Sequence, residues 1–191
     1  MNSFTAGIIV IGDEILSGRT QDSNSNFIAK NLLNEGIKLE EIIVIKDDKK
    51  TIIDRVLDYS IKYSYVFTTG GIGPTHDDIT SESISEAFNL KYVINEDAFN
   101  ILEKYYPKGE FNESRQRMAK MPTGSELLLN PMTAAPGFRI KNVYVLPGVP
   151  EIMQIMFLEL IKKIKKGKPK LIITINTDLY ESKIAIYLKE I

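Results

Sequence analysis

The sequence alternates short apolar runs with segments that have the periodicity of a helix, and this alternation constrains the fold more than any other feature. The first run, TAGIIVIG (Thr5–Gly12), is almost wholly apolar, which is typical of a strand buried on both faces. Two similar runs follow at Glu41–Ile45 and Tyr65–Thr69. Strands that alternate with helices at short intervals form βαβ units, so we expect a parallel sheet with helices on both faces.

Helical patterns lie between these runs. Asn24–Glu35 carries apolar residues at helical spacing, Asp48 is a candidate N-terminal cap, and a third helix is predicted over Asp77–Phe88. The less regular second half predicts these elements: helices over 96–106, over 112–120 and from Pro150 to about Lys166; short strands in ELLLN, GFRI and VYVLPG, with a hairpin around Lys141 and Asn142 at the sheet edge; a strand in LIITIN; and a last helix from Glu181.

These elements predict an α/β fold, a three-layer α/β/α sandwich around a mostly parallel sheet. The 191 residues suit one domain with an appendage. We place the domain at 1–167, and 168–191 is expected to be the start of a small, truncated C-terminal subdomain.

Composition narrows the chemistry and the location. The chain has no cysteine and one histidine, so a metal site would consist mainly of oxygen ligands, which suit magnesium, manganese or calcium. The net charge of −1 gives no reason to expect binding to nucleic acid or to anionic membranes. The sequence has neither a long apolar run for a membrane span nor a basic signal-peptide region, so we expect a cytoplasmic protein.

The stretch TTGGIGPTHDDIT (Thr68–Thr80) directly follows a predicted strand, where parallel sheets collect ligands. Its glycines let the backbone approach a phosphate, yet Asp77 and Asp78 would repel that phosphate. A divalent cation held between carboxylates and phosphate oxygens resolves the conflict. Asp13 and Glu14 follow the first strand in the same way, so the predicted metal ligands are Asp13, Glu14, Asp77 and Asp78.

Structural roles remain alternatives at these positions. Asp at a helix start often only caps the helix, and glycines after a strand often serve only the turn. The pattern is neither the dinucleotide fingerprint nor the Walker A sequence, so classical NAD binding and P-loop phosphate transfer are disfavoured. The role of His76 stays open between a base, a ligand, a hydrogen-bond donor to phosphate and a hydrogen-bonding residue within the turn.

Three arginines are candidates for phosphate contacts. Ser17 and Arg19 lie in a polar loop after the first strand, and Arg19 is either a phosphate partner or an exposed loop residue. Arg115 and Arg117 are two residues apart and face different sides of a helix. We expect one of these two to reach the ligand and the other to be solvated.

Five sequence blocks occur in a specific order: GDEILSGRTQDSN, TTGGIGPTHDDIT, MPTGSELLLNP, AAPGF and LPGVPEIM. Together they resemble the molybdopterin-binding-like domain at the N-terminus of CinA-type competence/damage-inducible proteins. That domain is similar to one fused to eukaryotic FAD synthases and, more distantly, to MoaB, MogA and the central domain of MoeA. The resemblance covers roughly residues 5 to 165 and implies the same three-layer fold.

The resemblance implies two branches of activity. One branch binds molybdopterin and adenylates it or inserts the metal. The CinA-type branch resembles a metal-dependent pyrophosphatase that splits ADP-ribose, and in some members FAD, with release of AMP. The GDE and GPTHDD blocks match the second branch better, so we expect such an enzyme, with magnesium, manganese or cobalt. A molybdopterin-binding protein of molybdenum cofactor biosynthesis and a non-catalytic nucleotide-binding module are the alternatives.

The resemblance also assigns residues. The candidate catalytic residues are His76, Asp77 and Asp78, and the candidate ligand-binding residues are Gly12, Ser17, Arg19, Thr69, Gly70, Gly71, Gly73, Pro147 and Gly148. Pro147 and Gly148 belong to a second ligand-side loop or serve a simple strand-to-helix turn.

Partners follow from the resemblance as well. Relatives are oligomeric, so a homo-oligomer, a dimer or trimer, is expected, with a nucleotide or pterin ligand and no nucleic-acid or membrane partner. The deamidase domain of many CinA proteins and the adenylyltransferase half of FAD synthases are not matched, so neither of those activities is expected.

Overall fold

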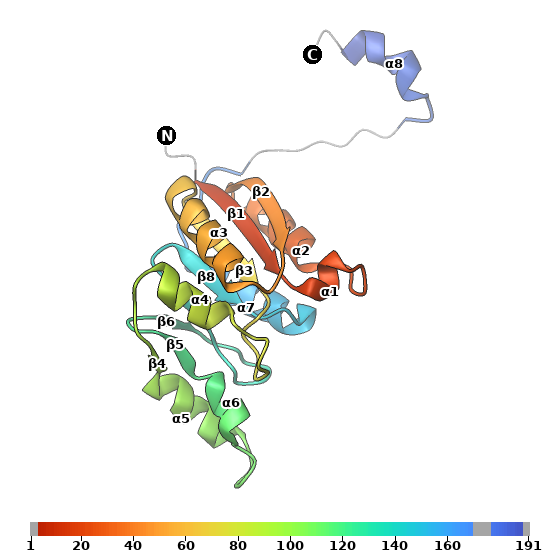
Figure 1. The fold of residues 1–191 in the computed structure, drawn as a ribbon. Coiled ribbons are helices and arrows are strands. Elements are labelled where there is room, and N and C mark those ends of the chain that lie inside the picture. Colours follow the sequence, from red (N-terminus) through yellow and green to blue (C-terminus); the bar gives the residue numbers. More distant parts are fainter. Residues whose placement is uncertain (1–3, 170–176, 189–191) are drawn as a thin grey trace.

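A computed structural model describes residues 4–169 and 177–188 of the chain. Figure 1 shows a central sheet with helices packed on both of its faces. The strand predicted in LIITIN lies outside the described residues. None of the helices in the described ranges has the length and apolar content that crossing a bilayer requires.

The main sheet has six strands in the order β2-β1-β3-β8-β7-β6. The first four are parallel, and β7 and β6 continue the sheet in antiparallel pairing. The strands are β1 (Thr5–Ile11), β2 (Lys38–Ile45), β3 (Tyr65–Thr69), β6 (Glu126–Leu128), β7 (Gly137–Ile140) and β8 (Val143–Leu146). The predicted mostly parallel α/β/α fold is confirmed, including the β7–β8 hairpin.

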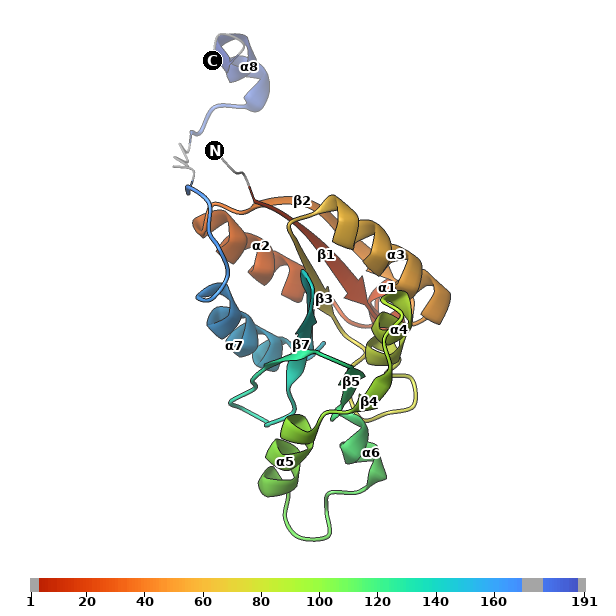
Figure 2. The same cartoon turned by 90° about the vertical axis from the view of Figure 1, so that its left-hand side faces the viewer.

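Two helical layers cover the sheet, as Figure 2 shows. Helices α2 (Asn24–Asn34) and α7 (Pro150–Ile161) lie on one face, and α3 (Lys49–Lys62) and α4 (Thr80–Ala87) lie on the other. Residues of β1 alternate between the two cores: Ile8 and Val10 pack under α2 and α7, and Ile9 and Ile11 pack under α3 and α4. The continuous apolar run of β1 is therefore explained by burial on both faces.

A small excursion separates α4 from β6. It contains β4 (Tyr92–Ile94), α5 (Glu96–Tyr105), α6 (Glu113–Arg117) and β5 (Lys120–Pro122), and β4 pairs with β5 in antiparallel orientation. The prediction of a helix over 112–120 was wrong at its end, because residues 120–122 pair with β4 instead. The sequence analysis missed both strands, since three residues are too short for a readable alternation.

Other helix and strand boundaries also differ from the predicted ones. β2 starts at Lys38 and not at Glu41, because its first residues pair with the start of β1. α7 ends at Ile161, short of the predicted Lys166, and α4 starts at Thr80 and not at Asp77. A short helix, α1 (Asp13–Leu16), follows β1, and α8 (Glu181–Leu188) is the predicted last helix. The cap at Asp48 is confirmed, since its side chain accepts a hydrogen bond from the Thr51 N–H.

The chain beyond α7 is held against the end of α2, near the start of β2. The Gly167 N–H donates to the Glu35 carbonyl at 3.0 Å, and Lys166 Nζ lies 2.9 Å from Glu35 Oε2. A Cβ on Gly36 would come within 2.4 Å of the Lys168 backbone, so the two segments touch without a side chain between them. This contact lies at the end of the sheet opposite to the carboxyl ends of β1 and β3.

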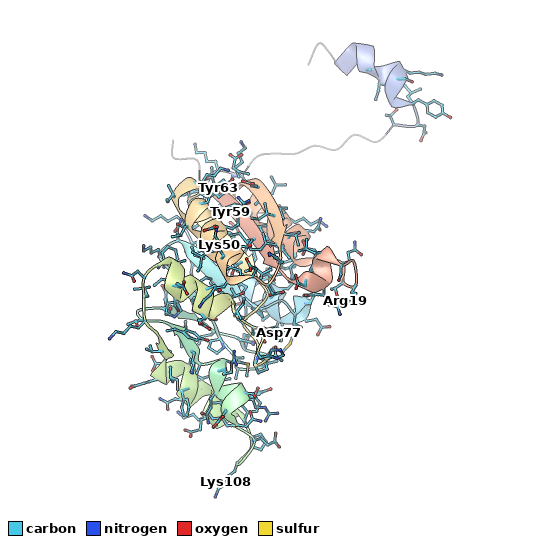
Figure 3. All side chains as sticks on the ribbon, viewed as in Figure 1. Arg19, Lys50, Tyr59, Tyr63, Asp77 and Lys108 are labelled. Atoms are coloured by element: carbon cyan, nitrogen blue, oxygen red, sulfur yellow. The ribbon has the colours of Figure 1, made fainter. Side chains whose placement is uncertain are left out.

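Glu41 on β2 is predicted to make the folding stability depend on pH in the acid range. Its pKa is lowered to about 2 because the Tyr63 hydroxyl and then the Lys62 ammonium donate to its carboxylate, with Tyr63 Oη 2.6 Å from Glu41 Oε2. Tyr63 is labelled in Figure 3. A lowered pKa stabilises the fold above the ordinary value of 4.5, and this contribution is lost as the pH falls from 4.5 toward about 2.

Glu41→Gln is therefore expected to be less stable than the parent at neutral pH, with a gap that closes between pH 4.5 and about 2. Urea unfolding across this pH range measures the gap. Glu40→Gln on the same strand serves as the control. A gap for Glu41→Gln that stays constant down to pH 2 would show that the carboxylate charge contributes nothing.

Candidate functional site

Three loops meet at the carboxyl ends of the parallel strands. The Gly12 N–H donates to the Ile45 carbonyl, and the Gly70 N–H donates to the Leu146 carbonyl, each at 3.1 Å. A Cβ on Gly148 would lie 3.4 Å from the Gly70 Cα, so the β3 and β8 loops are in close contact. The structure thus brings together the loops that start at Gly12, Gly70 and Pro147.

The backbone at Gly70 and Gly71 requires glycine. Their φ angles are 108° and 69°, a region that other residues rarely adopt. A Cβ on Gly70 would lie 2.1 Å from the Ile11 carbonyl oxygen, and one on Gly71 would lie 2.2 Å from Thr80 Oγ1. These glycines let the loop pack closely against the backbone of β1 and the start of α4.

The two aspartates of this loop differ in their surroundings. Asp78 is half-buried, and its carboxylate accepts hydrogen bonds from the Thr75 N–H, at 2.8 Å, and from the Thr75 hydroxyl. Asp77 and His76 expose 71% and 97% of their side chains, with His76 Nδ1 4.0 Å from Asp77 Oδ1. The helix cap is Ile79, so the capping role considered for Asp77 and Asp78 does not apply.

The loop after β1 supplies a second acidic surface. Glu14 is half-buried, and its carboxylate folds over Gly12, where a Cβ would lie 2.6 Å from Glu14 Oε1. Asp13 is exposed. Arg19 is exposed too, with its Nε 3.2 Å from Ser17 Oγ, and Figure 3 shows it well apart from Asp77. The structure therefore leaves Arg19 as an outer loop residue.

Asp47 is a third acidic residue at this edge, hydrogen-bonded to the loop after β1, and the sequence analysis missed it. Its Oδ2 accepts a hydrogen bond from the Asp13 N–H at 3.0 Å. Burial raises the pKa of Asp47, and the negative charges of Asp13, Glu14 and Asp77 raise it further, against the effect of that hydrogen bond. A readable signal was present, because Asp47 follows β2 just as Asp13 follows β1.

Carboxylates alone do not complete a metal site. In residues 4–169 and 177–188, no three Asp, Glu or His side chains gather as a metal-ligand group. A magnesium-like ion is commonly bound by one or two carboxylates together with phosphate oxygens. The crowding of negative charge around Asp47 fits a cation that binds together with a phosphate ligand.

Asp47→Asn is predicted to raise the melting temperature at neutral pH. The amide still accepts from the Asp13 N–H, and it removes a charge from an acidic surrounding. Because the pKa of Asp47 is raised, protonated Asp47 stabilises the parent at a pH below the ordinary value of 3.8, and this contribution is lost as the pH rises through the folded-state pKa. The gain should therefore disappear in acid. Thermal unfolding at neutral and acid pH tests this, and a variant less stable than the parent at neutral pH would refute it.

Arg115 and Arg117 have different environments. Arg115 Nη1 lies 2.6 Å from the Glu110 carbonyl oxygen, and its guanidinium stacks over Tyr106 at 4.2 Å, so it holds the excursion together. Arg117 is half-buried. Burial raises the pKa of Tyr92, the positive charge of Arg117 lowers it, and the negative charge of Asp78 raises it. Both arginines are partly buried, and the expectation that one of them reaches the ligand stays a prediction.

Comparison with known proteins identifies the family. A family model described as "Probable molybdopterin binding domain" matches residues 7–166. A protein of Archaeoglobus fulgidus is 40% identical over 161 residues, which is 84% of this chain and 69% of that protein. A CinA-like protein of Sulfurihydrogenibium is 37% identical over 171 residues, which is 85% of this chain but 43% of that protein.

Solved structures agree. The crystal structure of CinA from Thermoplasma acidophilum has a TM-score of 0.79 at 32% identity and covers 85% of this chain and 98% of its own. The tungsten cofactor synthesizing protein MoaB from Pyrococcus furiosus has a TM-score of 0.52 at 21% identity, covering 100% of this chain and 98% of its own, and shares the fold alone. The chain is therefore a member of the molybdopterin-binding domain family, of the CinA type.

Proposed function

We propose that the chain is a metal-dependent nucleotide pyrophosphatase that splits ADP-ribose or FAD-like dinucleotides and releases AMP. One observation carries the proposal: at the carboxyl edge of the sheet, Asp47 is hydrogen-bonded to the Asp13 N–H, and the negative charges of Asp13, Glu14 and Asp77 all raise the pKa of Asp47. Such an arrangement suits a doubly charged cation and a diphosphate bound together.

The chain's residues have separate roles in this proposal. Backbone N–H groups of Gly71 to Gly73 would stabilise negative charge on the phosphate oxygens, since the Gly70 N–H is already bonded to the Leu146 carbonyl. Asp77 and Asp78 would hold the cation, and Asp13, Glu14 and Asp47 would keep the surrounding field negative. Magnesium, manganese or cobalt would polarise the phosphoanhydride. His76, exposed beside Asp77, would help to orient the attacking water.

The second candidate is a molybdopterin-binding protein that transfers adenylate or holds the pterin. The description of the family model and the shared fold with MoaB favour it. The same glycine loop would then bind the phosphate of the pterin. A non-catalytic module is the third candidate, and it would bind a nucleotide without turnover.

AMP release separates these candidates. The protein is incubated with ADP-ribose and with FAD, each with magnesium, manganese or cobalt, and with chelator as the control. We expect AMP only when metal is present. A folded sample that releases no AMP from either substrate would refute the pyrophosphatase and favour pterin binding or the non-catalytic module, which direct binding assays then distinguish.

A further inference from the structure

Asn24, the first residue of α2, connects this helix to the end of β3 and to the loop before α7. Its side chain is 6% exposed. The amide Nδ2 donates to Thr69 Oγ1 and to the Gly148 carbonyl, each at 2.8 Å. The Thr69 hydroxyl in turn donates to the Pro147 carbonyl at 3.0 Å. Both amide protons of Asn24 are therefore hydrogen-bonded, and these two bonds connect α2 to β3 and to the loop before α7.

This network fixes which way the Asn24 amide points. A carbonyl such as that of Gly148 only accepts hydrogen bonds, and the Thr69 proton is committed to Pro147. The NH₂ group must face these two acceptors, so Oδ1 faces the other way. Within the described part of the chain Oδ1 is buried and has no hydrogen-bond partner. A buried acceptor without a donor costs about 1–3 kcal/mol, so the site is prepared for a donor.

A cavity of about 50 Å³ lies beside Asn24, bounded by residues 20–24 and by the ends of β1 and β3. It is large enough for a water molecule or one small functional group, and too small for a base or a phosphate. Its polar lining includes Asn24 together with Glu14 and Asp22, which bring carboxylates and an amide oxygen. Acceptors of this kind favour a hydrogen-bond donor and disfavour an anion.

We propose that Asn24 is a positioning residue whose Oδ1 accepts a hydrogen bond from a ribose hydroxyl of the bound nucleotide. A hydroxyl is the neutral donor that a nucleotide carries close to its phosphate. Gly148, which accepts from Asn24, packs against Gly70, so a phosphate on the glycine loop would place its sugar near this cavity. The inference rests on the proposed function, since it needs a nucleotide at the glycine loop.

The test compares ribose with deoxyribose ligands by calorimetric titration. AMP, 2′-deoxy-AMP and 3′-deoxy-AMP are titrated into the parent and into Asn24→Ala, and ribose 5-phosphate is compared with its 2-deoxy form. The parent should bind one deoxy ligand about tenfold more weakly, in line with the loss of a single buried hydrogen bond. In Asn24→Ala the ribose ligand should fall to the level of that deoxy ligand, so that the two losses do not add.

Asn142→Ala is the matched control. The Asn142 amide also bridges two carbonyls, those of Ser60 at 3.0 Å and Tyr63 at 2.8 Å, but at the opposite end of the sheet. It should lose stability and keep the ribose preference. Thr69→Val gives a second variant, which removes the hydroxyl that orients the Asn24 amide and should weaken the preference.

Each outcome of the titrations supports or overturns the role of Asn24. If the parent binds ribose and deoxyribose ligands equally well, the cavity takes up water and no ribose hydroxyl. This result overturns the inference and leaves the proposed function intact. A ribose preference that survives in both Asn24→Ala and Thr69→Val also overturns the inference alone. A parent that neither binds nor releases AMP overturns the proposed function and the inference together.

Discussion

Gly70→Ala is expected to destabilise the protein by about 3–5 kcal/mol, the combined cost of backbone strain and overpacking. The φ angle of 108° is one that alanine rarely adopts. The added Cβ would meet the Ile11 carbonyl oxygen at 2.1 Å. That oxygen belongs to the backbone of β1, which is held by strands on both sides and cannot move away without breaking the sheet.

Gly18→Ala is the matched control for this substitution. Gly18 also has a positive φ, 74°, but no atom lies within 4 Å of the place where its Cβ would be. Its cost should stay at about 1 kcal/mol, the penalty of a left-handed alanine alone. Urea unfolding of both variants measures the difference. Equal losses would mean that the contact with Ile11 relaxes freely and that the glycine loop is not held rigidly.

Asp78→Ala is expected to lower the rate of AMP release about 100–1000-fold, the scale found when a preorganised charge-stabilising group is removed. Two losses combine here. The substitution removes a carboxylate from the proposed cation site, and it frees Thr75, whose N–H and hydroxyl are held by that carboxylate. The measurement is the initial rate at saturating metal and substrate.

Asp77→Asn separates the two losses. Asp77 is 71% exposed, so its amide variant should keep the loop and lose only charge. Asp54→Asn is the control, because Asp54 is an exposed aspartate paired with Lys50 on α3. In a parent that releases AMP, an Asp78→Ala variant with the parent's rate would remove Asp78 from the site.

The central βαβ units were predictable because their signals are long and redundant. β1 carries an uninterrupted apolar run, and Asp48 and Gly36 mark the ends of helices by local chemistry that does not depend on the rest of the fold. The Thr68–Thr80 loop was found for a similar reason, since its glycines and acids are adjacent in the sequence.

Features that depend on strand order were not predictable in this way. The position of Asp47 after β2 was readable, but its hydrogen bond with the Asp13 N–H depends on the pairing of β2 with β1, which no local pattern specifies. Asn24 looked like an ordinary first residue of a helix, and its role depends on Thr69 and Gly148, which are far away in sequence. Short pairings such as that of β4 with β5 are decided by the packing of the whole excursion.

The contact between Gly36 and Gly167 sets the geometry of any tether attached to the protein there. A probe joined at Lys168 starts at the amino end of β2, whose eight residues extend about 26 Å toward the acidic edge. A fully extended linker needs about eight residues to cover that length, and a flexible glycine-serine linker needs about 20 for its average span to match. A fluorophore on a short linker at Lys168 would therefore report on folding without blocking the ligand, whereas a long linker would raise its effective concentration at the ligand edge.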